Sequence, residues 1–137
     1  MITPVVLIAA GVGYRLTYPT HPGPTLDAPG AFRKAAAGEI LLTDILRPDE
    51  WQATGSGKGA HRLDLQRPDF VEALSALAAG DRNRPIALIC AKGVRSARLA
   101  DLLSEIGFFN VSNVTEGMLG SSAGPGWIVW GLPVVKD

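Results

Sequence analysis

The sequence has a single cysteine, Cys90, and only two histidines, His21 and His61. One cysteine excludes an internal disulfide and a cysteine-rich zinc site. The two histidines are isolated in the chain, with no spacing that would bring metal ligands together. No metal and no other cofactor are therefore predicted for this protein.

The chain also lacks an excess of charge of either sign, because 13 basic residues balance 13 acidic ones. A neutral chain has no net field to attract nucleic acid or an anionic membrane, so neither is an expected partner. No apolar run reaches the roughly 20 residues that a membrane-spanning helix needs, and membrane contact is not expected. No internal repeat is visible, and one domain is the default for 137 residues.

The N-terminal part, residues 1–24, differs in composition from the rest of the chain, and we expect the domain itself to cover residues 25–137. An uncharged, largely apolar run from 2 to 14 precedes a linker rich in proline and glycine. Two interpretations stay open. The run is a strand and arm packed on a cytoplasmic protein, or it is what remains of an export signal or anchor that begins upstream, which would place the protein in the periplasm or on a membrane.

Strand and helix signals alternate after the linker. Alternation of this kind predicts an α/β fold, a single domain with a central, mostly parallel sheet flanked by helices on both faces. Active sites in such sheets lie beyond the carboxyl ends of the strands, which is where Cys90 falls. The expected helices cover 27–37, a short segment from Pro48, 68–80 and 96–107, and the expected strands cover 39–45, 62–65, 86–89 and 111–115.

Cys90 follows the apolar run 86–89 and precedes a helix with apolar residues at 99, 102, 103 and 106. A lone cysteine after an apolar run is often an inert core residue chosen for its volume. Here its surroundings favour a nucleophile. The start of a helix offers unpaired N–H groups and a partial positive charge, which favour the thiolate over the thiol. The cations Lys92 and Arg95 act in the same direction, and Gly93 permits a sharp turn.

The loop pattern Cys-x-x-Gly-x-Arg-Ser, at Cys90, Gly93, Arg95 and Ser96, resembles the active loop of the rhodanese-like sulfurtransferases. Residues 42–51, with the sequence Leu-Thr-Asp-Ile-Leu-Arg-Pro-Asp-Glu-Trp, are similar to the family segment Asp-Val-Arg-x-Pro-Glu-Glu-Trp. Further similarities lie at 107–111, 116–118 and 131–135, so the resemblance covers roughly residues 38–135.

The sequence differs from the family pattern at several positions in and around the active loop. Leu46 and Ala91 occupy positions that often carry arginine, and the glycine-rich segment 55–60 replaces the usual Gly-His-Ile-Pro-Gly-Ala. These changes concern contacts with the substrate and the rigidity of the loop. They leave the nucleophile itself in place.

The resemblance implies a thiosulfate sulfurtransferase that forms a persulfide on Cys90 and passes the sulfur to a thiophilic acceptor, which could be a small molecule or a protein. Arg95 either binds the sulfonate of the donor or braces the loop through backbone carbonyls, and Ser96 is expected to begin the helix. Asp44 is expected to orient the loop, and Met118 to line the donor pocket. The expected substrate-binding residues are Ala91, Lys92, Gly93, Val94, Arg95 and Ser96.

Two other functions compete with sulfur transfer for this loop. Protein tyrosine phosphatases space their cysteine and arginine as Cys-x5-Arg, whereas Cys90 and Arg95 are spaced Cys-x4-Arg. The smaller ring of amides suits a sulfur atom better than a phosphate, and no general acid is evident in a second loop. The second alternative is a persulfide carrier or sensor without turnover, or a rhodanese module that binds a protein. The loop sequence does not separate that alternative from an enzyme.

Overall fold

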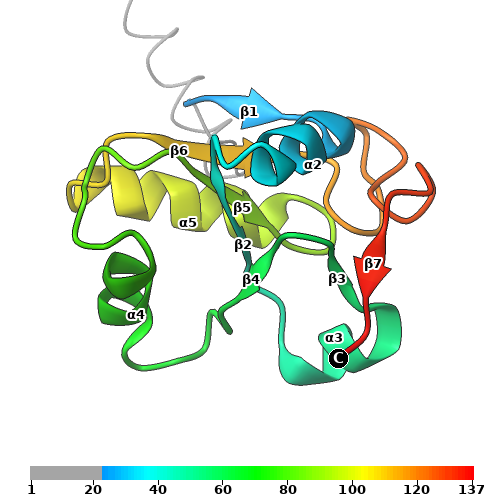
Figure 1. The fold of residues 1–137 in the computed structure, drawn as a ribbon, viewed down its shortest axis with the longest axis horizontal. Helices are drawn as coiled ribbons and strands as arrows, with labels where there is room; N and C mark the ends of the chain where they lie inside the picture. The colour runs from blue at the N-terminus through cyan, green and yellow to red at the C-terminus, as the bar shows by residue number, and fades with distance from the viewer. Residues whose placement is uncertain (1–22) are drawn as a thin grey trace, which may run out of the picture.

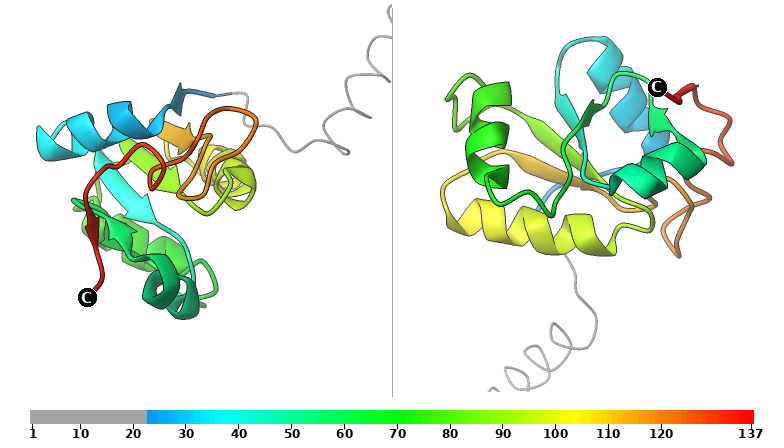
Figure 2. Two further views of the ribbon diagram at one scale, coloured as in Figure 1. Left: turned by 90° about the vertical axis from the view of Figure 1, so that its right-hand side faces the viewer. Right: turned by 90° about the horizontal axis from the view of Figure 1, so that it is seen from below.

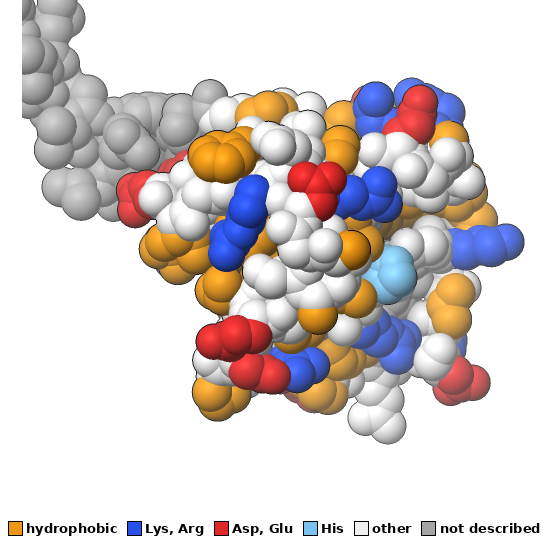
Figure 3. Space-filling model, turned by 60° about the vertical axis from the view of Figure 1, so that its left-hand side comes forward, with side chains coloured by type: hydrophobic (Ala, Val, Ile, Leu, Met, Phe, Trp, Pro, Cys, Tyr) orange, Lys and Arg blue, Asp and Glu red, His pale blue; other side chains and the backbone are white. Residues whose placement is uncertain are grey.

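The computed structural model describes residues 23–137. The predicted N-terminal arm and linker, residues 1–24, lie outside the described residues except for the last two. No helix within 23–137 combines the length and the apolar character needed to cross a bilayer. On the face drawn in Figure 3, basic and acidic side chains are interspersed, in keeping with the balanced composition.

Five strands form one parallel sheet in the order β1-β6-β5-β2-β4. The three central strands are buried along their whole length. The continuous apolar sequence of β5 predicts this for a strand covered on both faces. A separate antiparallel pair joins β3 (Ser56–Gly57) to β7 (Val134–Val135). The strands of the main sheet are β1 (Thr25–Leu26), β2 (Leu41–Asp44), β4 (His61–Arg62), β5 (Ile86–Ile89) and β6 (Val111–Val114).

The helices cover both faces of the sheet, so the predicted architecture is confirmed (Figures 1 and 2). Helix α2 lies on one face, and α4 and α5 lie on the other. Right-handed crossovers require this arrangement, because the chain crosses from β1 through β2 to β4 in one direction along the sheet and returns from β4 through β5 to β6 in the other. The helices are α2 (Ala28–Ala36), α3 (Pro48–Thr54), α4 (Phe70–Leu77) and α5 (Val94–Glu105).

Local sequence signals account for the ends of these helices. The side chain of Asp27 caps α2 by accepting a hydrogen bond from the N–H of Gly30 at 2.7 Å. Pro48 opens α3, and Asp49 and Glu50 stand in its first turn, where the positive end of the helix favours acids. Helix α5 ends at Glu105, just before Gly107, as predicted.

Some predicted details are wrong. The strand expected over 62–65 consists of His61–Arg62 only, and the helix expected from Pro68 begins at Phe70. Of the predicted apolar face of α5, Leu99 and Leu103 are buried, but Leu102 and Ile106, which follows the helix, are about half exposed, at 51% and 46%. Small residues complete the buried face in their place. The buried residues of α5 are Ser96, Ala97, Leu99, Ala100 and Leu103.

Candidate active site

The side chain of Cys90 lies at the carboxyl end of β5, next to the first turn of α5, and is 1% exposed. Its Sγ accepts a hydrogen bond from the backbone N–H of Gly93 at 3.2 Å. Ser96 Oγ lies 3.2 Å from the same sulfur. The sulfur therefore lies beside polar groups at the start of α5.

The loop that carries Cys90 is tied by its carbonyl groups to β6 and to the turn that follows β6. The N–H of Met118 donates to the carbonyl of Cys90 at 2.9 Å, and the N–H of Leu119 donates to the carbonyl of Ala91 at 2.8 Å. Asn113 Nδ2 donates to the carbonyl of Gly93 at 3.3 Å. Because the carbonyls are held on the outside of the loop, the N–H of Gly93 faces the sulfur.

Gly93 is required at the turn into α5. Its φ of 82° lies in the left-handed region, and a Cβ there would collide with the carbonyl oxygen of Thr115. The turn thus depends on the close approach of two backbone segments that only glycine permits. This observation agrees with the role predicted for Gly93.

Arg95 holds α5 against α3 through a two-point ion pair with Glu50. Its Nη1 and Nη2 lie 2.8 Å and 2.9 Å from the two carboxylate oxygens of Glu50. These hydrogen bonds lower the pKa of Glu50 to about 2. They also raise the pKa of Arg95, to which the nearby Cys90 contributes less. Arg95 thus braces the loop, one of its two predicted roles, through a carboxylate where backbone carbonyls were expected.

Ser96 differs from its prediction, because Gly93 and not Ser96 precedes the first residue of α5. Ser96 stands within the first turn and is fully buried, which directs its hydroxyl group to the cysteine. Lys92 and Val94 are exposed. Sequence reasoning assigned Ser96 to the helix start because it could not show that the first turn folds over Cys90.

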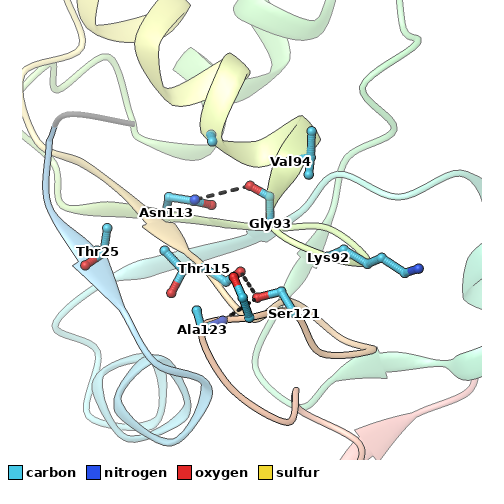
Figure 4. A pocket seen from close by; sticks show the side chains of 10 residues that line it. Thr25, Lys92, Gly93, Val94, Asn113, Thr115, Ser121 and Ala123 are labelled. Carbon is cyan, nitrogen blue, oxygen red and sulfur yellow. Dashed lines mark hydrogen bonds between the residues drawn. The ribbon is translucent and has the colours of Figure 1, made fainter. Parts of the chain in front are cut away.

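A cavity of about 340 Å³, lined by both polar and apolar groups, lies on the β6 side of the loop (Figure 4). The side chain of Lys92 extends away from Asn113 and Thr115, which lie between β1 and the active loop in this view. Ser121 Oγ donates to the carbonyl of Thr115 at 2.9 Å and so closes one side.

A second, smaller cavity of about 140 Å³ lies on the α3 side of the same loop. Met118, predicted to line the donor pocket, lines this cavity and is fully buried. That a donor binds there remains a prediction. The lining residues are Leu46, Glu50, Ala53, Thr54, Ala91, Met118 and Leu119.

Asp44 ends β2 and is fully buried. Burial raises the pKa of its carboxyl group, and the hydrogen bond from the N–H of Leu46 and the nearby polar groups of Trp51 and Ser56 oppose that shift. Its Oδ1 accepts the N–H of Leu46 at 3.0 Å. Asp44 therefore shapes the turn between β2 and α3, beside the active loop.

Comparison with known proteins identifies the class. The model of the Rhodanese-like domain matches residues 29–123, and the chain belongs to that family. No curated protein sequence matches the chain.

Solved structures of similar fold include sulfurtransferases. The polysulfide-sulfur transferase homodimer of Wolinella succinogenes is 24% identical, with a TM-score of 0.63 over 96% of this chain and 88% of that chain. The thiosulfate sulfurtransferase of Pseudomonas aeruginosa is 24% identical, with a TM-score of 0.63 over 82% of this chain and 20% of that chain. A Rhodopseudomonas palustris protein of unknown function, a possible tyrosine phosphatase, is 23% identical, with a TM-score of 0.62 over 82% and 84% of the two chains.

At these identities the structural likeness shows a shared fold. Together with the family match, it makes sulfur transfer the activity supported at the level of the family.

Proposed function

We propose that the protein transfers sulfane sulfur from a donor such as thiosulfate to a thiophilic acceptor through a persulfide on Cys90. The observation that carries the proposal is the position of Cys90 Sγ, 3.2 Å from the N–H of Gly93 and 3.2 Å from Ser96 Oγ, at the start of α5. A structural cysteine in an apolar core would have no such polar neighbours.

In the first step, the Cys90 thiolate attacks the outer sulfur of thiosulfate. A new S–S bond forms at Cys90, the S–S bond of thiosulfate breaks, and sulfite leaves with the electron pair of that bond. Cys90 then carries a persulfide anion, the negative charge of which lies on its terminal sulfur. The N–H of Gly93 and the hydroxyl of Ser96 support the negative charge on the attacking sulfur.

In the second step, an acceptor such as cyanide or a thiolate attacks the terminal sulfur of the persulfide and the Cys90 thiolate is released. Two half-reactions that share a covalent intermediate predict ping-pong kinetics. A protein with a nucleophilic cysteine could serve as the acceptor in place of a small molecule. In that case the domain would carry sulfur to a partner, which is the alternative left open by the loop sequence.

Mass spectrometry after treatment with thiosulfate tests the proposal. We expect an addition of about 32 Da, one sulfur atom, that maps to Cys90 and disappears on addition of cyanide. The variant Cys90→Ser should show neither the adduct nor the production of thiocyanate. Sulfur transfer by Cys90→Ser at the wild-type rate would refute the proposal. A wild-type adduct that a protein acceptor removes and cyanide does not would identify a carrier.

A further inference from the structure

Asn113 is a polar residue of β6 whose side chain reaches the active loop (Figure 4). It is almost fully buried, at 2% exposure. Its Nδ2 donates to the carbonyl of Gly93 at 3.3 Å, and no group in the described part of the chain donates to its Oδ1. The amide cannot be turned over, because Oδ1 would then face the Gly93 carbonyl and two acceptors would meet. Asn113 is therefore bound to the loop through its donor alone.

The hydrogen bond from Asn113 is not needed to satisfy the Gly93 carbonyl. The N–H of Ala97 already donates to that oxygen at 3.2 Å, in the first turn of α5. A buried amide oxygen without a partner lowers the stability of a fold, and a leucine of similar size would avoid this loss. Such an exception to favourable packing is typical of a functional site.

Gly93 connects Asn113 to the nucleophile. Its N–H donates to Cys90 Sγ at 3.2 Å, and its carbonyl, on the other side of the same Cα, accepts from Asn113. The backbone of glycine is freer than that of any other residue, so the direction of this N–H depends on what holds the peptide groups around Gly93. The carbonyl of Thr115 limits the space at the Cα, and Asn113 fixes the peptide group that follows it.

We propose that Asn113 is a positioning residue for sulfur transfer, which holds the N–H of Gly93 on the sulfur of Cys90 by binding the Gly93 carbonyl. The inference rests on the proposed function and adds a residue to it. Asn113 acts through Gly93 and not on the reacting sulfur itself.

Negative charge develops on Cys90 Sγ in the second step of the reaction. The acceptor attacks the terminal sulfur of the persulfide, the bond between that sulfur and Sγ breaks, and Sγ takes the electron pair. An N–H fixed on Sγ stabilises this charge, as the donors of an oxyanion hole do. In the first step Sγ loses negative charge as it attacks the donor, so the same N–H gives no such assistance. The effect of Asn113 is therefore expected in the second step.

The experiment measures both steps in single turnover for the wild type and for Asn113→Leu, which lacks the donor but has nearly the same size. Thiosulfate forms the persulfide, at a pH above which the rate of formation no longer rises, and cyanide then discharges it. Discharge should slow by about 10- to 100-fold, the order expected for a misplaced or missing charge-stabilising donor. Formation should change by less than about threefold, because the N–H does not assist that step. The midpoint of thermal unfolding should change by less than about 5 °C, since the unpartnered oxygen is removed together with the donor.

Two further variants separate positioning from packing. Asn113→Ala removes the same donor without adding hydrocarbon, and its rate of discharge should agree with that of Asn113→Leu within about threefold. Ser112→Ala is the matched control, because Ser112 precedes Asn113 on β6 and is 7% exposed. Its side chain points to the opposite face of the strand, so the rate of discharge should change by less than about twofold.

Discharge by Asn113→Leu at the wild-type rate would overturn the inference. An equal loss in Ser112→Ala, or equal losses in the two steps, would do the same. Failure of both Asn113 variants to fold would also overturn it, because Asn113 would then be required for the fold. A wild-type protein that forms no persulfide would instead refute the proposed function, so the two failures are distinguishable.

Discussion

Glu116 is the residue whose replacement tests the architecture around the site most directly. The residue is 2% exposed. Oε2 accepts the N–H of Ala28, the first residue of α2, at 2.7 Å. Oε1 accepts the N–H of Gly126 at 2.7 Å and the indole N–H of Trp130 at 2.8 Å. Because Ala28 belongs to the first turn of α2, the positive end of that helix also stabilises the buried charge.

The substitution Glu116→Gln keeps the shape of the side chain and removes its charge. One carboxylate oxygen becomes an amide nitrogen, which must then face at least one N–H donor. A hydrogen bond to a charged group contributes about 1.5–3 kcal/mol, and one such bond is lost outright. The remaining bonds fall to the strength of neutral ones, about half as strong. The expected loss in the free energy of unfolding is therefore about 3–5 kcal/mol.

Urea unfolding followed by tryptophan fluorescence measures this loss. Trp127 and Trp130 lie in the same segment as Gly126 and report on it. The matched control is Glu105→Gln at the exposed end of α5, which should change the free energy of unfolding by less than about 0.5 kcal/mol. A loss below about 1 kcal/mol for Glu116→Gln would refute the reasoning, since it would mean that the three N–H donors find other partners.

Two other predictions concern the active loop. Gly93→Ala should lower the free energy of unfolding by at least about 3 kcal/mol, and its control Gly107→Ala by about 1–2 kcal/mol. Both positions have positive φ, but of the two only Gly93 would bring the added Cβ into collision with a carbonyl, that of Thr115. Equal losses of stability for the two variants in thermal unfolding would contradict this prediction. The pKa of Glu50 is lowered from 4.5 to about 2, so its pair with Arg95 stabilises the fold fully above about pH 5 and loses that effect as the pH falls toward 2. The stability difference between wild type and Glu50→Gln should therefore shrink by about 2–3 kcal/mol between pH 6 and 2 in urea titrations, and a constant difference would count against the ion pair.

The sequence predicted the sheet well because its central strands are buried on both faces. Their continuous apolar runs distinguish β2 and β5 from surface segments, and the strand-to-helix junction located Cys90. Periodicity was less informative for α5, where small residues and not the leucines alone face the sheet. A pattern of apolar residues does not show how closely a helix approaches its neighbours.

The local sequence patterns could not predict which groups bind a buried charge. Glu116 contacts Ala28 across 88 residues of chain, and no composition signal connects the two. The sequence placed residues 116–118 in a family segment, but gave no reason to assign Glu116 a buried carboxylate. Such contacts follow from how elements meet, and they become predictable only when the pairing of the strands is known.

The ion pair between Glu50 and Arg95 could have been predicted if the register of the strands had been known. Asp44 at the end of β2 pairs with Ile89 at the end of β5 in the parallel sheet. Glu50 lies six residues beyond Asp44, and Arg95 lies six residues beyond Ile89. The connections 45–47 and 90–93 leave the same edge of the sheet and lead into α3 and α5, so the first turns of the two helices lie near one another and their opposite charges pair. The register of β2 against β5 is therefore the step that joins the acidic first turn of α3 to the cysteine loop.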